Sequence, residues 1–207
     1  MIIKHKNQRV GIFIDTQNLY HSAKNLYNSR VNFGTILEDA VASRELVRAI
    51  AYVITTESGE EKPFFEALEK LGIETKTKDL QIFYGGAKKA DWDVGIAVDA
   101  IKLAPRLDAV VIVAGDGDFV PLVEYLKGTT QVEVIAFGKS TSGKLKEVAD
   151  HFTDLCDNPS RYLLRQGGRP QQGGGARRPR RAPRRAPGDN QSTGSSTPQA
   201  PTPPAVQ

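Results

Sequence analysis

Four aspartates stand where their side chains can build one binding site for a divalent cation. Asp15 ends a short apolar segment, and Asp93 stands at the start of an apolar, helix-like run. Asp116 and Asp118 lie in a Gly-Asp-Gly-Asp turn directly after another apolar segment. Oxygen ligands without a His or Cys cluster favour Mg²⁺ or Mn²⁺ over zinc. The chemistry usually done at such a site is phosphoryl transfer or phosphodiester hydrolysis, in which the ion activates water and neutralises phosphate charge.

Each acid also has a simpler structural explanation. Asp93 is a suitable helix N-cap, Asp118 can cap the helix expected after it, and Asp116 can shape the turn between its two glycines. Asn18 can likewise be only a helix cap. Taken together, however, several carboxylates on one rim repel each other, and a divalent cation or raised pKa values are needed to make that tolerable. The set therefore favours a cation site.

The elements that must position these acids alternate between strand and helix. Continuous apolar segments rich in β-branched residues predict strands, and amphipathic segments predict helices. We expect strands at Arg9–Asp15, Leu46–Thr56, Ala109–Ala114 and Val132–Phe137, and one or two short strands at Ile73–Lys78 and Leu80–Tyr84. We expect helices at Leu19–Tyr27, Phe33–Ala42, Glu60–Leu71, Trp92–Leu103, Phe119–Lys127 and Lys144–His151.

This alternation predicts an α/β fold with a doubly wound, mainly parallel sheet of five or six strands covered by helices on both faces. Ligands of such sheets bind outside the carboxyl ends of the strands, at the point where the winding reverses. Asp15 and Asp116 each follow a predicted strand. If those two strands are neighbours at the reversal, their carboxylates converge, and the helix that begins near Asp93 starts on the same rim.

The C-terminal part of the chain has a different composition, so we expect a domain at residues 1–160 and a disordered basic tail at 161–207. Residues 167–207 contain seven arginines and one acidic residue, whereas residues 1–166 carry a net charge of −2. Arginines pair with phosphates and release counterions, which predicts RNA binding without sequence preference. The alternative is a tail that only solubilises the protein, or one that binds acidic proteins or a membrane surface.

Lys88 and Lys89 are candidate contacts to the RNA backbone, although a solvated surface pair explains them as simply. The tail arginines that we expect to bind RNA include Arg177, Arg178, Arg180, Arg181, Arg184 and Arg185.

Other features restrict the class of protein. The single cysteine, Cys156, excludes an intrachain disulfide, and neither an apolar run of membrane-spanning length nor a signal-peptide core is present,. We therefore expect a cytoplasmic protein without membrane insertion. The sequence has no P-loop, dinucleotide-binding or GxSxG motif,. A phosphatase of the haloacid dehalogenase type is disfavoured, because the second acid of its DxD motif is replaced by Gln17.

Four segments in order resemble the NYN domain, in its LabA-like branch, which is related to PIN-domain ribonucleases. They are "GIFIDTQNLYHSA", "KKADWDVGIAVDAIKLA", "DAVVIVAGDGDFVPLVEYLK" and "VEVIAFGKSTSGKLKEVADHFTDL". The resemblance implies a PIN-like α/β/α sandwich with a Mg²⁺- or Mn²⁺-dependent ribonuclease site. It also implies RNA as a partner, and allows RNA-processing or regulatory proteins and a homodimer.

The resemblance also assigns roles to residues. It implies that Asp15, Asp93 and Asp116 hold the ion, that Asp118 binds it directly or through water, and that Asn18 orients a phosphate oxygen or a water. Candidates for supporting positions are Asp99 and Ser142, which match the family motif, and Asp91, which matches no position of it and has no assigned role. Our leading hypothesis is a metal-dependent endoribonuclease. The alternative is an RNA- or protein-binding regulator with a weak or silent site, because LabA-like members include proteins described mainly by regulatory roles.

Overall fold

Six strands in the described part of the chain form one sheet in which every pairing is parallel. The structure is a computed structural model that describes residues 2, 4–55, 61–79, 81, 82, 88, 89 and 91–164. The strand order is β4-β3-β1-β7-β8-β9. The α/β fold with a parallel sheet is thus confirmed. The strands are β1 (Arg9–Asp15), β3 (Glu45–Thr55), β4 (Glu74–Asp79), β7 (Ala109–Val113), β8 (Gln131–Ala136) and β9 (His151–Asp154).

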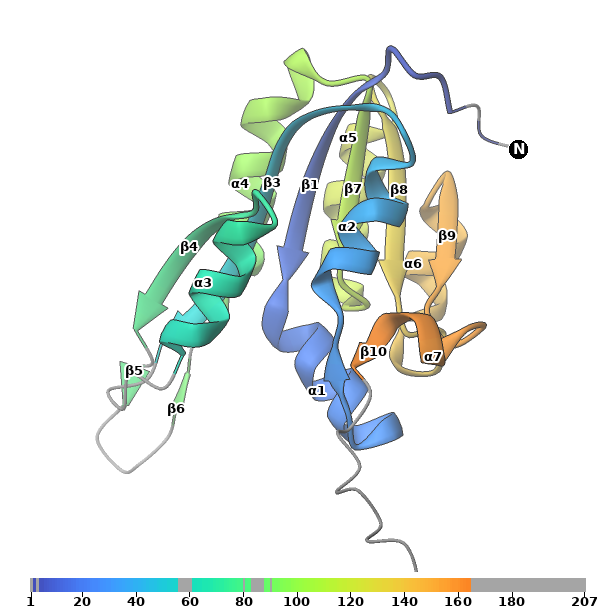
Figure 1. Ribbon diagram of the computed structural model, residues 1–207. Helices are drawn as coiled ribbons and strands as arrows, with labels where there is room; N and C mark the ends of the chain where they lie inside the picture. Colours follow the sequence, from blue (N-terminus) through green and yellow to red (C-terminus); the bar gives the residue numbers. More distant parts are fainter. Residues whose placement is uncertain are drawn as a thin grey trace, which may run out of the picture. The chain divides into compact units, whose positions relative to one another are not determined.

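Helices cover both faces of this sheet (Figure 1). Alternate residues of β1 point to opposite sides, so Ile12 and Ile14 pack with α1, α2 and α3, whereas Phe13 packs with α4, α5 and α6. Both layers are apolar and largely excluded from water, which is the main contribution to folding. The helices are α1 (Thr16–Tyr27), α2 (Phe33–Val41), α3 (Lys62–Lys70), α4 (Asp93–Leu103), α5 (Val120–Leu126), α6 (Gly143–Val148) and α7 (Pro159–Tyr162), with short 3₁₀ turns η1 (Ala104–Arg106), η2 (Gly117–Phe119) and η3 (Gly138–Ser140).

The winding of the sheet reverses between β1 and β7. From β1 the chain builds outward to β3 and β4, and it then returns to form β7 on the other side of β1 before continuing to β8 and β9. Ile14 of β1 pairs with Val113 of β7, so the turn after β7 lies next to the end of β1. The two strands are therefore adjacent, which was the condition for the carboxylates of Asp15 and Asp116 to converge.

The sixth strand differs from expectation. We expected Val132–Phe137 to be the last strong strand and Lys144–His151 to be a closing helix, whereas α6 ends at Val148 and is followed by β9, which pairs with β8. All four residues of β9 are only half-buried, and as an edge strand it lacks the continuous apolar run that identifies central strands,. The strand expected at Leu80–Tyr84 falls largely outside the described residues, which contain only β5 (Gln81–Ile82) from it.

Chain contacts continue beyond residue 160. The short strand β10 (Leu163–Leu164) pairs antiparallel with β2 (Arg30–Val31), and Tyr162 is buried beside α2. Arg161 bonds Asp39 through both side chains. The tail arginines lie outside the described residues. None of the helices in the described ranges is long and apolar enough to cross a membrane.

Candidate functional site

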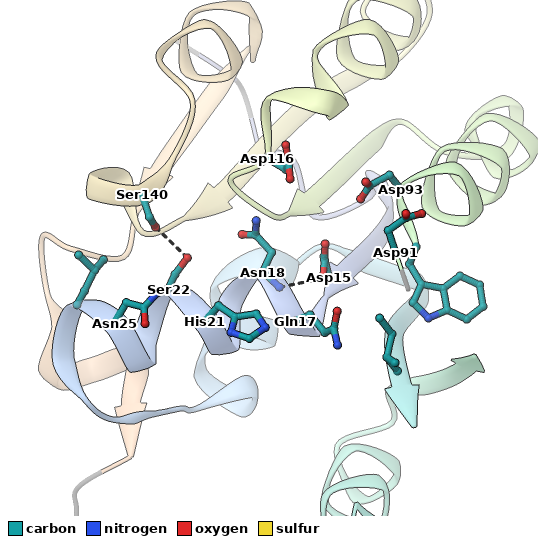
Figure 2. Close-up of a pocket in the computed structure, with 13 residues that line it drawn as sticks. Asp15, Gln17, Asn18, His21, Ser22, Asn25, Asp91, Asp93, Asp116 and Ser140 are labelled. Carbon is teal, nitrogen blue, oxygen red and sulfur yellow. Dashed lines mark hydrogen bonds between the residues drawn. The ribbon is translucent and has the colours of Figure 1, made fainter. Parts of the chain in front are cut away.

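A cavity of about 340 Å³ lies at the carboxyl edge of the sheet, where the winding reverses. Figure 2 shows the side chains of Asp15, Asp93 and Asp116 pointing into the same part of it. They come from the end of β1, the start of α4 and the turn after β7. Three segments that are far apart in the sequence therefore each contribute one carboxylate to this cavity.

Asp15 is fixed by the first turn of α1. Its carboxylate accepts the Asn18 N–H at 3.0 Å, so it is the N-cap of that helix. Burial raises the pKa of Asp15, the N–H groups of Asn18 and Gln17 lower it in part, and the charge of Asp116 raises it further. Because the helix begins with this cap, α1 starts at Thr16, three residues before the expected Leu19.

Asn18 connects α1 to the turn after β7. Its side-chain oxygen accepts the Gly115 N–H at 2.9 Å. The NH₂ group of the same amide is then the part of the side chain that can donate a hydrogen bond to a phosphate oxygen or a water. The explanation of Asn18 as a helix cap is therefore wrong, because Asp15 caps α1. Asn18 instead bonds Asp15 through its backbone and the residue before Asp116 through its side chain.

Asp116 belongs to a turn that is pressed against the loop before α6. A Cβ on Gly115 would come within 2.6 Å of Thr141 Oγ1, so only glycine allows this approach,. Ser142, one of the expected supporting residues, donates its N–H to the Gly115 carbonyl at 3.0 Å. The Asp116 carboxylate in turn accepts the Asp118 N–H at 3.0 Å, so Asp116 rather than Asp118 is the cap of η2.

Asp93 does not cap α4. It is the first residue of the helix, the capping position is Trp92, and no side chain caps the helix there. Burial, followed by the charges of Asp15, Asp116, Asp91 and Asp118, raises the pKa of Asp93 to about 6. The explanation of Asp93 as a helix N-cap is therefore wrong. The charges of the other four acids each contribute to its raised pKa.

Trp92 fixes the start of α4. Its Nε1–H donates to the Val53 carbonyl at 3.0 Å, and its ring meets Tyr52 edge-on at 5.3 Å. A Cβ on Gly95 would come within 2.5 Å of the ring, so the absence of a side chain there lets Trp92 lie against the first turn. This role of Trp92 was not predicted from the sequence, although its position between two candidate site residues, Asp91 and Asp93, indicated that it lies near the site.

The structure does not bring all of the expected acids to the cavity. Asp91 lines it, but Asp118 is exposed and is not among the lining residues. Asp99 accepts hydrogen bonds from Lys76 Nζ at 2.6 Å and from the Tyr52 hydroxyl at 2.7 Å, away from the lining. Lys88 and Lys89 form strand β6, and their side chains are outside the description.

Four polar residues at one end of the cavity are among the lining residues that were not predicted as site residues. His21, Ser22 and Asn25 continue the face of α1 that begins with Asn18, and Ser140 joins them from η3. The Ser140 hydroxyl bonds the Ser22 hydroxyl at 2.8 Å. The signal for this face was the spacing of polar residues at i, i+3, i+4 and i+7, which places them on one side of a helix.

The donor set fits Mg²⁺ or Mn²⁺ in its chemistry, because Asp15, Asp93 and Asp116 offer only carboxylate oxygens,. Within the described ranges, however, no three His, Cys, Asp or Glu side chains are grouped closely enough to hold an ion as they stand. Ligation of one ion by all three would therefore require these carboxylates to come closer together. The raised pKa values of Asp15 and Asp93 record the burial and mutual repulsion that a cation would offset,.

Comparisons with known proteins agree with this architecture. The sequence model of the NYN domain matches residues 9–156. The Low amplitude and bright protein LabA of Synechococcus elongatus is 27% identical over 159 residues, which are 72% of this chain and 84% of LabA. The crystal structure of a Vibrio parahaemolyticus protein of unknown function is 33% identical, with a TM-score of 0.71, and the match covers 79% of this chain and all of that one.

Proposed function

Because this chain belongs to the NYN domain family, whose fold is PIN-like, we propose that it is a metal-dependent endoribonuclease. The observation that carries the proposal is the convergence of Asp15, Asp93 and Asp116 in one cavity at the reversal of the sheet. Burial and like charge raise the pKa of Asp93 and Asp15, a pattern that is concentrated at functional sites,. The substrate would be RNA, and the reaction hydrolysis of internal phosphodiester bonds.

The proposed roles follow from the position of each side chain. When bound, Mg²⁺ or Mn²⁺ would activate a water and neutralise the charge of the attacked phosphate. Asp15, Asp93 and Asp116 would hold the ion. We assign Asp118, whose charge contributes to the raised pKa of Asp93, to bind the ion through a water. The NH₂ group of Asn18 would donate to a phosphate oxygen, since the oxygen of this amide already accepts the Gly115 N–H.

The basic tail would supply affinity that the domain lacks. Residues 1–166 carry a net charge of −2, and the cavity edge is acidic, so long-range electrostatics of the domain oppose the approach of RNA,. Arginines between residues 169 and 185 would bind phosphates without sequence preference and raise the local concentration of RNA,. A cytoplasmic location, a homodimer and RNA-processing or regulatory partners complete this proposal.

The proposal is tested by incubating the purified protein with total cellular RNA in Mg²⁺ or Mn²⁺. We expect cleavage by the native protein, and a loss of about 100-fold or more in Asp15→Asn and Asp116→Asn, because ion binding contributes several kcal/mol to the transition state. Asp157→Asn, which changes an exposed aspartate outside the cavity, is the matched control and should cleave normally. Unchanged cleavage by both site variants would refute the assignment.

One observation favours a second function, that of an RNA- or protein-binding regulator with a silent site. No three acids in the described segments are grouped closely enough to hold a cation without rotation. Such a protein would bind RNA equally well with metal or with chelator and leave it intact in both. The nuclease instead requires cleavage that appears on addition of Mn²⁺ and disappears on chelation.

A further inference from the structure

The cavity has two chemically different ends. Its acidic end is formed by the carboxylates of Asp15, Asp93 and Asp116. Its other end, here called the neutral end, is formed by His21, Ser22, Asn25 and Ser140. These side chains offer hydroxyl, amide and imidazole groups, which both donate and accept hydrogen bonds. The half-buried apolar side chain of Leu26 lines the same cavity.

From this division we propose that the neutral end binds the nucleoside adjoining the attacked phosphate, in an unpaired stretch of RNA. The inference rests on the proposed function, and it names the substrate as single-stranded RNA. A phosphate is repelled by free carboxylates and is accepted beside them only with a cation. A base edge and a ribose hydroxyl carry no charge, and they match side chains that donate and accept.

The neutral end is held in place by a contact between distant segments. The hydroxyl of Ser140 in η3 bonds the hydroxyl of Ser22 in α1 at 2.8 Å, and so joins the turn after β8 to the helix after β1. The Ser140 hydroxyl also donates within its own turn to the Phe137 carbonyl, at a distance of 3.1 Å. Asn25 and His21 are exposed beside this contact, so their polar groups remain accessible to a ligand.

A cation stands next to the neutral end. Lys139 directly precedes Ser140, is exposed, and forms no ion pair with a carboxylate that the structure describes. The neighbouring lysines are engaged: Lys144 lies 3.8 Å from Glu124, and Lys146 donates to the Gly138 carbonyl. We assign Lys139 to the phosphate on the side of the bound nucleoside that is away from the acidic end.

The tryptophan of the cavity, Trp92, is already in contact with protein groups. Trp92 meets Tyr52 edge-on, contacts the backbone at Gly95, and has Lys78 Nζ 5.9 Å from its ring centroid. A base that stacked on this half-buried ring would compete with these protein groups,. At the neutral end the contacts are hydrogen bonds, together with the imidazole ring of His21, and such hydrogen bonds require base edges that are not already paired,.

The first test locates bound RNA by photocrosslinking of the full chain to a short single-stranded RNA that contains 4-thiouridine. The buffer contains Ca²⁺ in place of Mg²⁺ or Mn²⁺, so that a cation offsets the charge of the acidic end without supplying the metals expected to support cleavage. We expect crosslinked peptides from the middle of α1, around His21 and Asn25, in addition to any from the basic tail. Crosslinks confined to the tail or to surfaces away from α1 would overturn the proposal.

The second test measures the binding of the same RNA, and of its duplex, by fluorescence anisotropy in the same Ca²⁺ buffer. We expect Asn25→Ala to weaken single-strand binding about fivefold, the effect of one lost hydrogen bond of about 1 kcal/mol. Lys24→Ala is the matched control, because it changes the adjacent exposed residue, which does not line the cavity. Equal losses in both variants, or a duplex that binds as tightly as the single strand, would contradict the inference.

These outcomes separate the inference from the proposed function. Crosslinking at α1 without cleavage in Mn²⁺ would support RNA binding at the neutral end and refute the proposed nuclease activity. Cleavage in Mn²⁺ that depends on Asp116, with no crosslinking at α1, would support the nuclease and remove the neutral end as the place where RNA binds.

Discussion

At Asp93 the pKa rises to about 6, because burial and then the charges of Asp15 and Asp116 disfavour the ionised form. A carboxyl group with a raised pKa in the folded state stabilises the fold at low pH, and this contribution is lost as the pH rises through the folded-state value. For Asp93 it is fully present below about pH 4 and lost through about pH 6. The acidic site therefore weakens the fold at neutral pH.

From this we expect Asp93→Asn, which cannot ionise, to be more stable than the native protein at pH 7.5. The gain should be about 1 kcal/mol, since solvent exposure reduces the effect of the shift. Near pH 4 the two proteins should unfold alike, because the native group is then protonated. Urea unfolding in chelator at the two pH values measures this. A gain of the same size at both pH values would show that charge repulsion is not its cause.

Single residues also show the limits of prediction from sequence. The convergence of Asp15 and Asp116 was predictable, because each follows a strand and the ends of parallel strands share one edge. The position of Asp118 was not, since it depends on the turn in which its N–H bonds Asp116. Asp99 was equally hidden, because Lys76 and Tyr52 bind it from neighbouring strands.

At the scale of elements, the start of α4 is positioned by the packing of Trp92 on Gly95. Alanine is favoured over glycine inside a helix by about 1 kcal/mol. At Gly95, however, a Cβ would come within 2.5 Å of the Trp92 ring, and such overpacking usually costs about 1–3 kcal/mol. The steric effect should exceed the helix preference, so that Trp92 and the start of α4 must move.

We therefore expect Gly95→Ala to lower the free energy of unfolding by about 1 kcal/mol, the balance of these two effects. It should also change the emission of Trp92, the single tryptophan of the chain. Gly143→Ala is the control, because nothing lies within 4 Å of its added Cβ. Native stability and unchanged emission in Gly95→Ala would argue against this role for the packing.

The central elements were predictable from the sequence, and the peripheral ones were not. The strands β1, β7 and β8 are buried on both faces and therefore stand out as continuous apolar runs,. The edge strand β9 has one neighbour and half-buried side chains, so its sequence carries little signal. The polar face of α1 was present in its spacing, but only the fold shows that it lines a cavity.

At the scale of the whole domain, the two ends of the sheet differ in whether their acidic side chains are paired with basic ones. At the amino end, Arg44 and Glu133 are buried and joined at 2.5 Å, and Arg9 bonds Asp108 through its side chain at 2.9 Å. At the carboxyl end, by contrast, aspartates repel one another across the cavity. Acidic groups are thus paired where they support structure and gathered where they serve the proposed chemistry.

The basic tail leads to a prediction about salt. The slope of log K against log[salt] is about −0.7 for each phosphate contact to a single strand. Replacing Arg177, Arg178, Arg180, Arg181, Arg184 and Arg185 by serine should therefore flatten the slope by up to about 4 in chelator. Replacement of the same residues by lysine, which keeps the charge, is the control. An unchanged slope in the serine variant would show that the tail does not bind RNA.

The most direct test of the account is a titration with Mn²⁺ followed by the fluorescence of Trp92, which lies between two aspartates of the cavity. Mn²⁺ is paramagnetic and quenches nearby tryptophans. We predict saturable quenching of the native protein, weakened about tenfold or more, or about 1.4 kcal/mol, in each of Asp15→Asn, Asp93→Asn and Asp116→Asn, and unchanged in Asp157→Asn. Absence of saturable quenching, or quenching that survives in all three site variants, would contradict the claim that these carboxylates form one cation site.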